Sequence, residues 1–117
     1  MIEILNITAD YNQSFNISLE DGSNLFFKIN YIHSQKSWFF SLQKDAFIIN
    51  NLRLVTTPSL LFQFKNIINF DILVLSSDIY DPGFLTDFTT GRIRIFVLNA
   101  DDRQFIDTTI SGIINGN

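Results

Sequence analysis

The chain has 117 residues and a formal net charge of -4, and it contains no cysteine. This length fits one domain with a single hydrophobic core. The lack of cysteine excludes disulfides, thiolate nucleophiles and cysteine-based zinc or iron–sulfur sites. Eight Lys and Arg residues, spread singly, offer no basic patch for nucleic acid or an anionic membrane. No apolar run approaches the roughly 20 residues of a membrane-spanning helix, and MIEILNIT does not read as a signal peptide, so we expect a cytoplasmic chain.

The first strand signal is an alternation of period two on both sides of a turn. Phe15, Ile17 and Leu19 alternate with polar residues, and the alternation resumes after Asp21-Gly22-Ser23. This pattern predicts a β-hairpin. The Asp-Gly pair suits a tight turn, although a longer loop with a bulge would use the same residues.

The next predicted strand is SWFFSLQ, residues 37 to 43. Successive side chains of a strand point to opposite faces, so Trp38, Phe40 and Leu42 would share one face and Phe39 would lie on the other. Further strands are predicted at residues 46–49, 52–56, 70–76 and 92–99. The segment after Pro58 fits either an edge strand or one helical turn. Because no long helical stripe is present, the sequence predicts an all-β fold, a small antiparallel sandwich or barrel.

A long loop, residues 77–91, precedes the last predicted strand. Loops of this length in a compact domain are usually functional or pinned by something outside the domain. After the last strand the sequence DTTISGIINGN is too short to form a core of its own. We therefore expect one β domain over residues 1–107 and a flexible or partner-bound tail over 108–117.

Several predicted strands are apolar on both faces, whereas one exposed face of a small sandwich is normally polar. Burying one such side chain contributes roughly 1.5 to 3 kcal/mol, so about five exposed ones forfeit a sum comparable with a domain's stability of roughly 5 to 15 kcal/mol. We predict that other subunits cover them; the alternative is that loops and the tail fold over them. The candidate interface residues are Phe26, Phe39, Phe84, Phe88, Arg92, Arg94, Phe96, Ile110 and Ile113.

Arg92 and Arg94 share a strand face, an arrangement that could clamp a carboxylate across an interface. Little else carries chemistry. His33 is the only histidine. The acids of the long loop could collect a Ca²⁺ ion, but their spacing matches no EF-hand, and solvated turn acids fit better. We therefore expect no enzyme, no catalytic residue, no cofactor and no metal.

A family resemblance follows from the order of the signals along the chain: ADYNQSFNISLEDG, SWFFSLQ, NNLRLVTTPSLLFQFKN, DILVLSSD and DPGFLTDFTTGRIRIFVLN. This order resembles the cyanophage baseplate plug family, small proteins of contractile-tailed bacteriophage baseplates, over roughly residues 7 to 100. The family's early Gln-x-Phe strand corresponds to Gln13 and Phe15, and its strand Trp corresponds to Trp38. Its middle Leu-Leu segment corresponds to Leu60 and Leu61. Its late Asp-containing loop, which leads through a Gly into an apolar strand, corresponds to Asp87 and Gly91. The chain departs from the family at Thr89-Thr90, where a single Leu often precedes the Gly, and in its longer apolar tail.

The resemblance implies a structural role. The protein would be a plug on the tail axis of the virion baseplate, closing the tail tube or joining it to the central hub and spike, after assembly in the host cytoplasm. Its partners would be hub, spike and tail-tube proteins, with three or six copies in a cyclic ring and no nucleic acid or membrane. The alternative function is a small ligand- or glycan-binding β-barrel module that uses Trp38 and the long loop.

Overall fold

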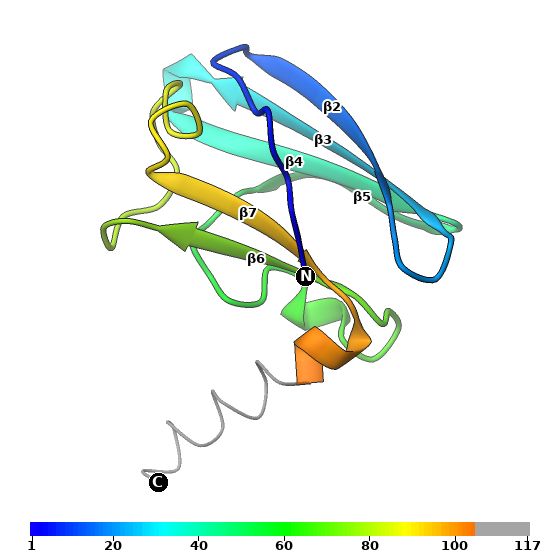
Figure 1. The fold of residues 1–117 in the computed structure, drawn as a ribbon. Coiled ribbons are helices and arrows are strands. Elements are labelled where there is room, and N and C mark those ends of the chain that lie inside the picture. Colours follow the sequence, from blue (N-terminus) through cyan, green and yellow to red (C-terminus); the bar gives the residue numbers. More distant parts are fainter. Residues whose placement is uncertain (105–117) are drawn as a thin grey trace, which may run out of the picture.

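The computed structural model describes residues 1–104 as two antiparallel β-sheets packed face to face (Figure 1). The four-stranded sheet has the order β2-β3-β4-β5 and the three-stranded sheet the order β1-β7-β6. The strands are β1 (Ile2–Glu3), β2 (Asn12–Ser18), β3 (Asn24–Ile32), β4 (Ser37–Lys44), β5 (Phe47–Arg53), β6 (Asp71–Ser76) and β7 (Ile93–Leu98). The predicted all-β fold is confirmed, and of the two architectures expected, sandwich or barrel, it is the sandwich.

The predicted hairpin is formed by β2 and β3. Its connection runs over residues 19–23, where the Leu19 N–H donates to the Ser23 carbonyl at 2.8 Å and the Gly22 N–H donates to the Leu19 carbonyl at 3.0 Å. Gly22 has a φ of 87°, a conformation that favours glycine. The longer of the two connections left open by the sequence is therefore the one formed.

In β4 the inner face holds Trp38, Phe40 and Leu42, all of them buried. Phe39 is half-buried on the outer face, opposite Asn30 of β3 and Arg53 of β5. In place of the two strands predicted at 46–49 and 52–56 there is one strand, β5, because a bulge opposite Phe40–Leu42 carries the chain through Asn50-Asn51. β5 ends at Arg53, so residues 54–56 lie outside it.

The three-stranded sheet contains β1, which the sequence analysis missed. Ile2 pairs with Val97 and Glu3 with Phe96. The segment after Pro58 forms a short 3₁₀ helix over Phe62–Phe64 rather than an edge strand. Just before it, Thr57 forms an isolated bridge to Val74 on the outer edge of β6.

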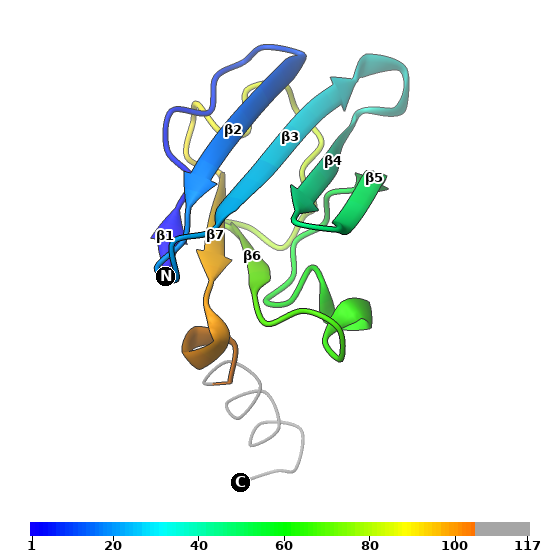
Figure 2. The same cartoon turned by 90° about the vertical axis from the view of Figure 1, so that its right-hand side faces the viewer.

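The core lies between the two sheets, which face one another across it (Figure 2). Trp38, Phe27 and Phe40 are its largest fully buried side chains, and the rings of Phe27 and Phe40 stack with their centroids 6.0 Å apart. Within residues 1–104, no helix has the length and apolar character needed to cross a membrane.

Candidate functional site: the loop over residues 77–91

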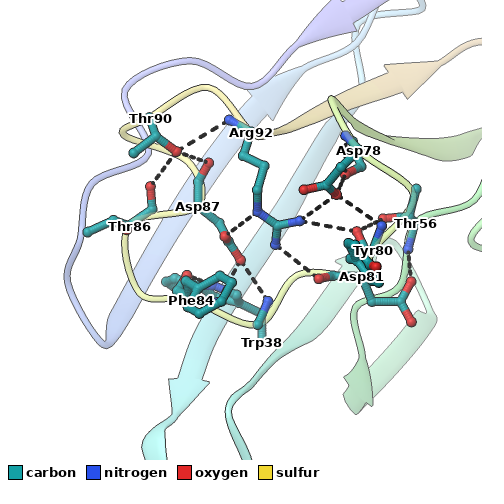
Figure 3. Close-up of polar contacts among 12 residues, drawn as sticks. Trp38, Thr56, Asp78, Tyr80, Asp81, Phe84, Thr86, Asp87, Thr90 and Arg92 are labelled. Atoms are coloured by element: carbon teal, nitrogen blue, oxygen red, sulfur yellow. Dashed lines mark hydrogen bonds and ion pairs between the residues drawn. The ribbon is translucent and has the colours of Figure 1, made fainter.

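The loop over residues 77–91 is held together by the carboxylate of Asp87, which is 1% exposed. One oxygen, Oδ2, accepts the backbone N–H groups of Gly83 at 2.7 Å and Phe84 at 2.8 Å. The other, Oδ1, accepts Arg92 Nε at 2.8 Å (Figure 3). A buried carboxylate is costly unless it is paired and hydrogen-bonded, and here these three donors supply both.

Arg92 joins the two halves of the loop. Its Nη1 donates to Asp78 Oδ1 at 2.9 Å and to the Tyr80 carbonyl at 3.3 Å, and its Nη2 donates to the Asp81 carbonyl at 3.0 Å. The hydrogen bond to Asp87, followed by the negative charges of Asp87 and Asp78, raises the pKa of the Arg92 guanidinium. The planar fork of five N–H donors lets one arginine bind several acceptors at once.

Two aromatic side chains of the four-stranded sheet fasten the loop to the core. Tyr31 donates its hydroxyl to the Gly83 carbonyl at 2.9 Å, and Trp38 donates Nε1–H to the Phe84 carbonyl at 3.0 Å. The ring of Phe88 packs edge-on against Trp38, with centroids 5.0 Å apart. The loop is thus pinned from inside the chain, although its length alone was also compatible with a contact outside the domain.

The fixed loop displays large apolar side chains. Ile79 is 88%, Tyr80 68% and Phe84 64% exposed. The carbon of the Arg92 guanidinium lies 5.5 Å from the centre of the Phe84 ring, so Arg92 also contacts this exposed side chain. Ile79 and Tyr80 were missed by the sequence analysis; the signal for them was an adjacent apolar pair inside the polar stretch SSDIYDPG.

Both arginines proposed as carboxylate clamps bind carboxylates of their own chain. Arg92 binds Asp87 and Asp78, and Arg94 makes two hydrogen bonds to Glu3, at 2.9 and 2.8 Å. The hydrogen bond from Arg94 lowers the pKa of Glu3. Neither arginine needs a partner subunit to balance its charge.

The remaining interface candidates lie elsewhere. On the outer face of the four-stranded sheet Phe26 is 46% exposed and Phe39 is half-buried. On the outer face of the three-stranded sheet Phe96 is half-buried beneath Arg94, whose guanidinium carbon lies 5.0 Å from the ring centre. Ile110 and Ile113, and the end of the expected domain at residue 107, fall outside the described residues.

The acids of the loop do not gather around a vacant centre. Asp78 and Asp87 bind Arg92, and Asp81 Oδ1 accepts the Thr56 N–H at 2.9 Å. Among residues 1–104 no group of three or more His, Cys, Asp or Glu side chains is arranged to hold a metal ion. His33 is exposed beside the edge of the Tyr31 ring.

Several residues that carried the family resemblance have structural roles at or near this end of the molecule. Asp87 and Trp38 make hydrogen bonds that hold the 77–91 loop, and Gly91 turns the chain into β7 with a φ of 77°. The Gln13 side chain fixes the chain before β2: its Oε1 accepts the Thr8 N–H at 2.8 Å and its Nε2 donates to the Thr8 carbonyl at 2.7 Å.

The fold and the loop define a small all-β sandwich that presents apolar side chains on a rigid frame, an arrangement suited to assembly. The chain belongs to the family described as cyanophage baseplate Pam3 plug gp18, whose model matches residues 1–101. No curated protein matches the chain. The protein is therefore a structural plug subunit of a phage tail baseplate, located in the virion and associated with other baseplate proteins.

Proposed function

We propose that the protein sits on the tail axis, where it closes the tail tube or joins it to the hub and spike, and that the apolar side chains of the 77–91 loop are its principal anchor. The observation that carries this proposal is the exposure of Ile79, Tyr80 and Phe84 on a loop held by a buried carboxylate. A preordered loop loses little conformational entropy on binding, so its aromatic side chains can act as interface anchors.

A ring of three or six copies, built from head-to-tail contacts after synthesis in the host cytoplasm, accords with a position on an axis. Two further contact regions are proposed: Phe26 and Phe39 on the outer face of the four-stranded sheet, and Phe96 on the outer face of the three-stranded sheet. Their neighbours would be the hub, spike and tail-tube proteins.

The rival reading, a glycan- or ligand-binding module, relied on Trp38 as an aromatic platform. Trp38 is 0% exposed and its indole N–H is already bonded to the loop. A buried ring cannot stack on a sugar or a base, so this observation removes the platform. A baseplate family also argues against an enzyme.

The test is incorporation into particles. In phage that carry Ile79→Ser together with Phe84→Ser, we expect purified tails to lose most of this chain, at least tenfold by quantitative mass spectrometry. The matched control is Phe62→Ser together with Ile67→Ser, since these two side chains are 56% and 71% exposed but lie outside the loop. Equal incorporation of both double variants would refute the loop as the anchor.

A further inference from the structure

The free edges of the two sheets are unequal. The outer edge of β6 is covered, because Thr57 and Val74 exchange backbone hydrogen bonds and the Leu60 N–H donates to the Ile72 carbonyl at 2.9 Å. β1 has only two residues. The edge of β5 is interrupted by its bulge, where the Ser41 hydroxyl accepts the Asn51 N–H at 3.0 Å. Proteins use such coverings, short strands and bulges to prevent unwanted strand pairing.

β2 has none of these protections. Its seven residues, NQSFNIS, pair with β3 without a register shift and include no charge and no proline. In an antiparallel pair, alternate residues direct their backbone groups to the partner strand. The bonds from Tyr31 N–H to the Tyr11 carbonyl and from Leu19 N–H to the Ser23 carbonyl show that odd-numbered residues face β3. The backbone groups of Ser14, Asn16 and Ser18 therefore point away from the sheet.

These outward groups have no hydrogen-bond partner among the described residues. The segment before β2 meets it through the Gln13 side chain, which binds Thr8 and the Asp10 carbonyl. On the inner face of β2, Phe15 and Ile17 are only partly buried although they pack against the core. A further strand beside β2 would pair the backbone groups and complete the cover of these two side chains.

The charges at the two ends of β2 indicate the kind of strand that fits. Exposed Asp10 precedes the strand and exposed Glu20 and Asp21 follow it, and none of the three forms an ion pair within residues 1–104. If two copies paired β2 antiparallel with Ser14 opposite Asn16, Asp10 of each copy would lie opposite Glu20 of the other. Like charges directly opposite one another are destabilising. Self-pairing is therefore disfavoured in this register, in which residues 12–18 of the two copies overlap completely.

We infer that β2 accepts a strand from another baseplate protein by β-augmentation. This inference rests on the proposed function and specifies one of its contacts. The added segment runs antiparallel to β2 and contains no proline. Its inward residues are apolar to meet Phe15 and Ile17, and its outward residues are polar. Lys or Arg flanks it at both ends, opposite Asp10 and the pair Glu20-Asp21.

The chain's lack of cysteine makes a clean experiment possible. Tails are purified from phage that carry Asn16→Cys or, as a second reporter, Ser14→Cys. They are treated with a benzophenone maleimide and irradiated, and the cross-linked peptides are identified by mass spectrometry. Asn50→Cys is the matched control, because Asn50 is an exposed asparagine on β5, at the other edge of the same sheet.

We expect cross-links from positions 14 and 16 to one contiguous segment of another baseplate protein, flanked by basic residues, with no cross-link from position 50 to that segment. Loss of both β2 variants from tails that retain Asn50→Cys would also support the inference. Cross-links to a second copy of this chain, or only to its own residues 4–10, would overturn it. Absence of the unaltered chain from tails would instead refute the baseplate function itself.

Discussion

The loop over residues 77–91 and the outer face of the four-stranded sheet both carry apolar side chains outward, but they are held in different ways. Backbone hydrogen bonds between the strands hold the sheet face, so the backbone positions of Phe26 and Phe39 do not depend on their side chains. The loop depends on a few side chains: the buried carboxylate of Asp87, its partner Arg92, and the hydrogen bonds from Tyr31 and Trp38. A strand tolerates changes on its exposed face, whereas an irregular segment is only as rigid as the few side chains that bind its backbone.

The largest difference should come from two neighbours on β4. Phe40→Ser empties a core position that is 1% exposed, and we expect it to lower the free energy of unfolding by at least about 3 to 5 kcal/mol. Phe39→Ser, on the outer face, should cost less than about 1.5 kcal/mol, keep a normal circular dichroism spectrum and still weaken assembly. Urea unfolding of both variants measures this, and equal losses would show that Phe39 belongs to the core.

Within the loop, Asp87→Asn should lower the free energy of unfolding by about 3 kcal/mol, because it leaves Arg92 without its buried partner and places an amide among N–H donors. Limited proteolysis should then cut between residues 77 and 91. Asp101→Asn, at an exposed aspartate, is the matched control. An Asp87→Asn variant as stable and as resistant as the control would contradict the role given to this carboxylate.

The smallest effect concerns pH. The Ser76 hydroxyl, the Tyr80 N–H and the nearby Arg92 lower the pKa of Asp78 below its ordinary value of 3.8. A carboxyl with a lowered folded-state pKa binds fewer protons in the folded than in the unfolded state. Its contribution to stability is therefore complete above pH 3.8 and is lost as the pH falls through the folded pKa. Asp78→Asn should flatten the pH dependence of the urea midpoint in that range, and an unchanged slope would rule this out.

The sequence predicted the parts of this fold that depend on local pattern. The β2–β3 hairpin and the inward face of β4 follow from period-two alternation. β1 was missed because two residues carry no period, and their partners are Val97 and Phe96 at the other end of the chain. The bulge of β5 was read as a break, since Asn50-Asn51 is typical of a turn.

The loop was located correctly, but the way it is held was not predicted. The bonds that fix it join residues distant in sequence, such as Tyr31 and Gly83, so no local pattern shows them. Asp87 carried a usable signal: a short acidic side chain that follows Pro-Gly by a few residues can bind the backbone N–H groups of the turn. Because Asp87 and Arg92 bind each other within the chain, the presence of an exposed-looking arginine in the sequence need not imply a carboxylate from a partner subunit.

The pairing of Ile2 with Val97 also determines the order in which the protein can fold. The strands β2 to β5 are consecutive neighbours, so contacts close in sequence can build the four-stranded sheet as soon as residue 53 is available. The three-stranded sheet closes across almost the whole chain and must wait for β7. During synthesis we therefore expect the first sheet to form early with its inner aromatic face uncovered, and chaperones that bind apolar surface to act at that stage.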